Sequence, residues 1–75
     1  MLVSDLSWLD CPLPVLKAKK FLANLEPSAE VSFITTDPSS LYDFQDFCKK
    51  TGHTLIKQSV ENGIITTVIR RRPNT

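Results

Sequence analysis

Apolar residues recur at two periods along this sequence, and each period predicts a type of element. Between Pro12 and Pro27 the apolar positions lie three or four residues apart, which indicates an amphipathic helix. We expect this helix to begin near Pro12 and to end at or before Glu26, because a proline disfavours helical geometry in the residue before it. Its apolar stripe comprises Val15, Ala18, Phe21, Leu22 and Leu25.

A second helix is predicted after the sequence Thr-Asp-Pro-Ser at residues 36–39. Asp37 is the expected N-cap and Pro38 the expected first helical residue, because an acceptor side chain and a preset backbone angle suit those positions. Gly52 is the expected stop, since glycine accepts the left-handed conformation that ends many helices. The buried face would consist of Leu41, Phe44, Phe47 and Cys48.

Four short runs at residues 2–6, 31–35, 55–61 and 64–70 predict strands, the last three being rich in β-branched and aromatic residues. Asn-Gly at positions 62–63 predicts a tight hairpin between the last two.

The expected hairpin register places apolar residues on both faces of the sheet. It pairs Val60 with Ile65 and Ile56 with Ile69 on the face assigned to the core. The other face would carry Leu55, Ile64 and Val68. That face is either ordinary surface, since exposed apolar atoms are normal, or a docking or dimer surface.

The predicted order is therefore β-α-β-α-β-β, an α+β fold. We expect a two-layer α/β sandwich in which both helices cover one face of a four-stranded mixed sheet. A chain of 75 residues is long enough for one small domain, which we expect to span residues 1–75.

Composition excludes several classes of protein. The net charge of +1 excludes a strongly steering electrostatic field, and two cysteines are too few for a disulfide framework. No apolar run approaches the length of a membrane span, and the absence of Lys or Arg before Lys17 argues against a signal peptide. We therefore expect a cytoplasmic protein with reduced thiols and no membrane partner.

Cys11 is the main candidate for chemistry. It precedes Pro12 and is expected at the start of the first helix, where the helix dipole favours the thiolate. The dipole is worth about 0.3–1 kcal/mol, so it lowers a thiol pKa by less than about one unit. Pro12 and Pro14 remove backbone donors that would otherwise hold the sulfur. An exposed, moderately acidic thiol suits sulfur exchange, although a small residue at a helix start is the plain alternative.

Other chemistries fit the sequence less well. Cys11, Cys48 and His53 are too few and too scattered for a metal site, so no metal or cofactor is expected. His53 follows Gly52 directly, which favours a turn histidine over a partner for Cys11. Cys48 lies on an apolar helix face and is expected to be buried.

The run from Leu9 to Lys17 contains C-P-L-P at residues 11–14 and resembles the C-P-x-P signature of the TusA/SirA family of small sulfur-carrier proteins. Thr-Asp-Pro at 36–38, Phe-Cys at 47–48 and Gly-His at 52–53 are similar to that family in order and spacing. The resemblance covers roughly residues 5–71.

The resemblance implies a specific function. Cys11 would carry a persulfide, taken from a cysteine desulfurase or a rhodanese-like donor and passed to an acceptor protein. The pathways that the resemblance suggests are tRNA 2-thiouridine synthesis and other sulfur trafficking. Pro12 and Pro14 would shape the loop, and Asp37 would lie near the donor-facing surface. The chain departs from the family at Trp8, where a glycine is usual, and this puts the choice of partner in doubt.

The rival hypothesis is a non-catalytic RNA-binding or redox-regulatory module. Arginines at positions 70–72 could contact phosphate, but fold analogy is weak support for function. Direct nucleic-acid binding is therefore not the favoured prediction.

Overall fold

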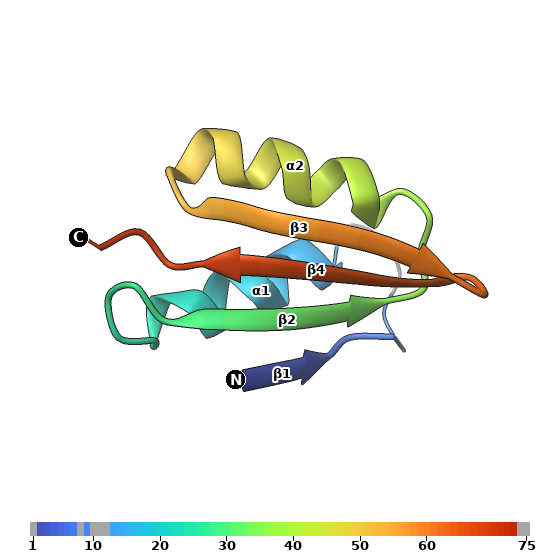
Figure 1. Ribbon diagram of the computed structural model, residues 1–75, viewed down its shortest axis with the longest axis horizontal. Helices are drawn as coiled ribbons and strands as arrows, with labels where there is room; N and C mark the ends of the chain where they lie inside the picture. The colour runs from blue at the N-terminus through green and yellow to red at the C-terminus, as the bar shows by residue number, and fades with distance from the viewer. Residues whose placement is uncertain (1, 8, 10–12, 74–75) are drawn as a thin grey trace.

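The computed structural model describes residues 2–7, 9 and 13–73. Its elements are β1 (Leu2–Asp5), α1 (Leu13–Ala23), β2 (Glu30–Thr35), α2 (Ser40–Thr51), β3 (Thr54–Glu61) and β4 (Ile64–Arg70). This order confirms the predicted β-α-β-α-β-β succession (Figure 1). None of the described helices has the length and apolar character needed to cross a membrane.

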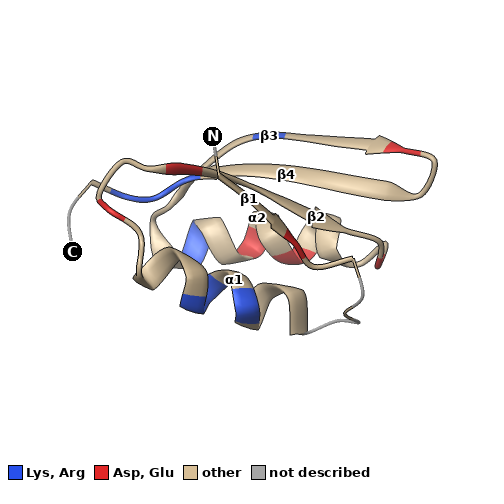
Figure 2. Cartoon of the chain, turned by 90° about the horizontal axis from the view of Figure 1, so that it is seen from below, with Lys and Arg blue, Asp and Glu red and all other residues tan. Residues whose placement is uncertain are grey.

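The four strands form one mixed sheet in the order β1-β2-β4-β3. β1 pairs with β2 in parallel, whereas the other neighbours are antiparallel. Both helices lie on the same face of the sheet, and the other face is left open (Figure 2). The predicted two-layer sandwich is confirmed.

This topology gives the molecule two distinct ends. β1 and β2 finish at the same end because they are parallel, and α1 and α2 start there (Figure 1). The β3–β4 turn lies at this end too, since Ile65 pairs with Thr35. We call it the loop end. The opposite end, where α1 and α2 finish and β4 ends, is called the helix C-terminal end.

Aromatic packing joins the helices to the sheet. The Phe33 ring of β2 stacks on Phe44 of α2, with ring centres 5.5 Å apart, and meets Phe21 of α1 edge-on at 5.9 Å. Phe33 and Phe44 are fully buried, and burying such a side chain stabilises the fold by about 1.5–3 kcal/mol. The same core contains Leu6, Leu9, Ala18, Leu22, Val31, Phe47, Cys48 and Ile69.

The predicted hairpin register is right at the turn and wrong further along. Val60 pairs with Ile65 as expected, but Leu55 replaces Ile56 opposite Ile69, because the register shifts between Leu55 and Lys57. This irregularity inserts one extra residue, and a one-residue slip exchanges the faces of a strand. Leu55 therefore packs against the core, while Ile56 is 40% exposed.

Two further residues differ in burial from the prediction. Val60 shares a face with buried Ile65 yet is 59% exposed, because the hairpin extends beyond the helices that cover the sheet (Figure 2). Val68 lies on the open face yet is buried, because β4 is an interior strand with Ser32 and Lys57 as its neighbours.

Candidate functional site

Cys11 and Pro12, together with Trp8, lie outside the residues that the structure describes. The described residues on either side are Leu9, which is buried in the core, and Leu13, which begins α1. Pro14 is the second residue of α1 and is fully buried. A proline in the first helical turn removes no intrahelical hydrogen bond, so it fits this position without cost.

Hydrogen bonds hold the described part of the segment that follows β1. The Leu6 N–H donates to the Ile34 carbonyl at 2.7 Å, and the Leu9 N–H donates to the Leu6 carbonyl at 3.1 Å. The Ser7 N–H donates to Asp5 Oδ1 at 2.9 Å. Hydrogen bonds from the Ser7 side chain and backbone lower the pKa of the Asp5 carboxyl. The segment that leads to Cys11 is thus anchored to β2.

A second link joins this segment to the β2–α2 connection. The Thr36 hydroxyl donates to the Ser7 carbonyl at 2.7 Å, across 29 positions of sequence. The segment that follows β1 and the segment that follows β2 are therefore joined at the loop end, at Ser7 and Thr36.

Asp37 organises the approach to α2, although it is not the N-cap. α2 begins at Ser40, and Ser39 occupies the N-cap position without a side-chain capping bond. Asp37 Oδ1 instead accepts the Ser39 N–H at 3.0 Å and the Ser39 hydroxyl at 2.9 Å. The predicted helix start at Pro38 is therefore wrong, because aspartate bonds the backbone two residues on and forms a turn first.

Asp37→Ala should lower the free energy of unfolding by about 0.5–1.5 kcal/mol, because the Ser39 N–H loses its acceptor. Asp37→Asn is the matched control: it keeps an oxygen acceptor at the same position and removes only the charge. Urea unfolding followed by circular dichroism measures both variants. Equal stability of Asp37→Ala and the wild type would contradict the assigned role.

Cys48 is a buried thiol on α2, as the sequence predicted. It is 7% exposed and belongs to the core cluster. Burial raises the pKa of the Cys48 thiol to about 11, because the low-dielectric surroundings penalise the thiolate. At neutral pH this cysteine is therefore a protonated core residue and a poor nucleophile.

His53 lies at the helix C-terminal end, away from Leu9 and Leu13, which flank Cys11. Its Nδ1 accepts the Arg72 N–H at 3.0 Å, and its ring lies 5.7 Å from that of Phe47. Burial and then the positive charges of Arg72 and Arg71 lower the pKa of the His53 imidazole. The described partners of the His53 ring are thus the Arg72 backbone and the Phe47 ring.

Two exposed leucines at the start of α1 were missed from the sequence. Leu13 and Leu16 are 44% and 52% exposed and line a shallow depression together with Lys17 and Lys20. Their spacing of three residues, on the same side as the lysines, was the available signal. These side chains form an apolar surface with a basic rim, two residues after Cys11 in sequence.

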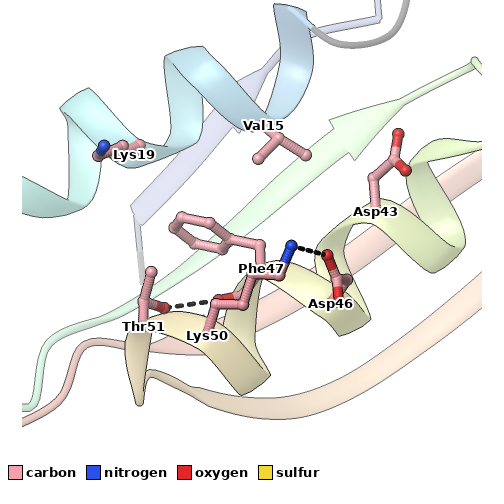
Figure 3. Close-up of a pocket in the computed structure, with 7 residues that line it drawn as sticks. All are labelled: Val15, Lys19, Asp43, Asp46, Phe47, Lys50 and Thr51. Atoms are coloured by element: carbon pink, nitrogen blue, oxygen red, sulfur yellow. Dashed lines mark hydrogen bonds and ion pairs between the residues drawn. The ribbon is translucent and has the colours of Figure 1, made fainter.

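A groove runs between the two helices (Figure 3). Val15 and Lys19 of α1 line it with Phe47 of α2 on the facing side. The ion pair from Lys50 to Asp46, 2.9 Å long, lies on the α2 side of the groove and is largely exposed, so it adds little to stability. The apolar residues in the walls of the groove are Val15 of α1 and Phe47 of α2.

Residues 3–71 match the family model described as sulfurtransferase TusA. This chain belongs to the TusA family. The match includes the C-P-L-P run at residues 11–14 and ends at Arg71, so it takes in every described helix and strand apart from the first residue of β1. The expected resemblance is thereby confirmed.

Relatives and a solved structure agree with membership of the TusA family. The chain is 40% identical over 67 residues to the sulfur carrier protein TusA of Allochromatium vinosum, covering 89% of this chain and 88% of that protein. It is 34% identical over 70 residues to the TusA of Pseudomonas aeruginosa, covering 93% and 89%. The crystal structure of a SirA-like protein from Desulfitobacterium hafniense superimposes with a TM-score of 0.83 at 28% identity, covering 96% and 99%.

Proposed function

We propose that this TusA-family protein carries sulfane sulfur as a persulfide on Cys11 and relays it from a donor protein to an acceptor protein. The observation that carries the proposal is the family match over residues 3–71, which includes the C-P-x-P run. Family membership supports the sulfur-carrier role. The persulfide on Cys11, the donor and the acceptor are our extension of it.

The proposed transfer is an exchange without net oxidation. The Cys11 thiolate attacks the outer sulfur of a donor cysteine persulfide and forms a new sulfur–sulfur bond. The old sulfur–sulfur bond breaks, and the donor cysteine leaves as a thiolate. Attack by an acceptor thiolate on the outer sulfur repeats the exchange and returns Cys11 to its starting form. Atoms and electrons balance without a metal or an organic cofactor.

Such an exchange needs a thiolate but no strong base. An ordinary thiol has a pKa of about 8.5, so roughly a tenth of it is ionised near pH 7.5. A thiol with a pKa near ambient pH is the best attacking group for sulfur exchange. By contrast, Cys48, with a pKa of about 11, is almost wholly protonated there. Cys11 is therefore the cysteine that suits the chemistry.

The exposed leucines of α1 suit the docking of the donor. Leu13 and Leu16 offer apolar area beside the position of Cys11 in sequence, and Lys17 and Lys20 surround them with positive charge. Interfaces commonly combine a desolvated apolar centre with a charged rim. We assign this face to a cysteine desulfurase or a rhodanese-like donor whose surface carries acidic groups around an apolar patch.

Loading experiments test this proposal. The protein is incubated with a cysteine desulfurase and cysteine, or with a rhodanese and thiosulfate, and intact mass is measured. The wild type should gain sulfur that dithiothreitol removes. Leu16→Glu should load at least about tenfold more slowly, because a carboxylate in the apolar centre must be desolvated and faces a donor surface that carries acidic groups. Leu2→Glu, at an exposed leucine of β1, should load normally. Normal loading of Leu16→Glu would contradict the assignment of this face to the donor.

The structure gives the RNA-binding alternative no support from the basic run at residues 70–72. Arg70 donates to Glu30 at 2.7 Å and is occupied by that ion pair. The Arg71 side chain is buried and bonds the Leu22 carbonyl. The three arginines therefore do not form a continuous exposed strip that could follow a phosphate backbone.

A further inference from the structure

A small cavity lies at the helix C-terminal end, opposite the end where Leu13 begins α1. It has a volume of about 190 Å³ and brings together three parts of the chain: α1, the end of α2 with His53 in the connection to β3, and the segment that follows β4. Its principal lining residues are Lys19, Phe47, Thr51, His53, Arg71 and Arg72. The carrier chemistry proposed for Cys11 uses none of them.

The two arginines of this cavity are held in fixed positions. Arg71 is 9% exposed, and its Nε donates to the Leu22 carbonyl near the end of α1 at 2.8 Å. The Arg72 guanidinium donates to the Thr51 carbonyl at the end of α2 at 2.6 Å. The backbone of Arg72 is fixed as well, by its hydrogen bond to His53. Both cations are therefore preorganised.

The charges around the cavity do not cancel. Lys19, Arg71 and Arg72 contribute three positive charges, and the lining contains no carboxylate. The ion pairs among the described residues involve Lys50 and Arg70 instead. Each helix C-terminus contributes about half a negative charge, so the two together offset about one of the three. The lining of this concave site therefore keeps a net positive charge.

Unused donors are available to a ligand. A guanidinium has five N–H groups, and the Arg71 side chain makes hydrogen bonds through Nε and Nη1 to two carbonyls. Among the described residues, no fully buried side-chain nitrogen or oxygen lacks a partner. Arg71 Nη2 takes part in neither of these bonds and is therefore not fully buried, and Arg71 lines the cavity.

We propose that this cavity binds a tetrahedral oxyanion, phosphate or sulfate. Planar guanidinium donors match such oxygens in geometry, and Lys19 adds a mobile point charge from α1. The anion would link Lys19 to Arg71 and Arg72, so it would tie α1 to the segment after β4. This site is independent of the persulfide proposed on Cys11, and the two proposals can fail separately.

The single histidine of the chain gives a direct readout. His53 faces Lys19, Arg71 and Arg72 in the cavity, and Lys49 and Lys50 lie in the nearby last turn of α2. Burial and the two arginines lower the pKa of His53, whereas a bound dianion favours the imidazolium. Saturating phosphate or sulfate should therefore raise the His53 pKa, measured by NMR titration, and should raise the melting temperature. Chloride at matched ionic strength should raise neither to the same extent.

Two lysine variants and a phosphate monoester complete the test. Lys19→Gln should weaken phosphate binding about two- to fivefold, the effect of one exposed charge, while Lys57→Gln on the open sheet face should bind as the wild type does. If uridine 5′-monophosphate binds with the same dependence on Lys19, the site also accepts a phosphate group that is part of a larger molecule. If it does not bind, the site is specific for the free ion. Equal responses to phosphate and chloride, or unaltered phosphate binding by Lys19→Gln, would overturn the proposal.

Discussion

Cys11→Ser is expected to abolish sulfur loading and to leave the melting temperature almost unchanged. Serine is nearly isosteric with cysteine and is a favoured residue at helix starts, so the fold should lose little. Its hydroxyl cannot form a persulfide and gives no appreciable anion at neutral pH. Loading should therefore fall to the background of the assay, which is the largest effect that the proposed function predicts.

Cys48→Ser is the matched control for this experiment. It places a hydroxyl in the core where the thiol is 7% exposed, so it should lower the melting temperature yet still accept sulfur on Cys11. Cys11→Ser should thus change loading alone, and Cys48→Ser should change stability alone. Sulfur gained by Cys11→Ser and removed by dithiothreitol would contradict the assignment, and unfolding of Cys11→Ser would make Cys11 a structural residue.

Alkylation of the native protein should distinguish the two cysteines by at least about twentyfold. The pKa of Cys48 is about 11. An ordinary thiol near 8.5 has about 300 times more thiolate at neutral pH. The more basic Cys48 thiolate is the stronger nucleophile, which reduces this 300-fold difference by a factor of about 10 to 20. Burial of the Cys48 side chain slows its reaction further.

Iodoacetamide labelling followed by peptide mass analysis measures both rates on one sample. In denaturant the rates should converge, because the burial that raises the Cys48 pKa is lost. The sign of the pH dependence is also fixed: native Cys48 labelling should keep rising with pH up to about 11, whereas labelling of an ordinary thiol should level off above about 8.5. Similar native rates near pH 7.5 would contradict the assigned difference.

Residue periodicity was sufficient to predict the layers of the fold, because each layer follows from local patterns. The apolar stripe marks α1, and the Asn62-Gly63 turn marks the β3–β4 hairpin. Both helices then pack their apolar sides on the same face of the sheet. The irregularity in β3 depends on a single inserted residue. Leu55 and Ile56 are both apolar, so the sequence alone could not decide which faces the core.

Candidate site residues were predictable where one residue type carries the chemistry. Cys48 stood out by its place on an apolar helix face, and the structure confirms that it is buried there. Cys11 stood out by its prolines, and its role stays a prediction because Cys11 lies outside the described residues. The predicted start of α2 was two residues too early, with Asp37 in place of Ser39 as the N-cap, since capping and turn formation use the same side-chain acceptor.

The cationic cavity could not have been read from the sequence. Arg71 and Arg72 looked like an exposed basic run, but the structure bonds them to Leu22 and Thr51, two carbonyls distant in sequence. Only tertiary packing then adds Lys19 from α1 to the same cavity. Such convergence of distant residues leaves no periodic signal in the chain.

Locating the transferred sulfur within the wild-type protein tests the central claim most directly. After incubation with a cysteine desulfurase and cysteine, free thiols and persulfides are alkylated, the chain is digested, and peptide masses are compared with a sample without donor. The account predicts one added sulfur atom on the peptide that contains Cys11, removable by dithiothreitol, and none on the peptide that contains Cys48. Added sulfur on Cys48 with none on Cys11 would contradict it.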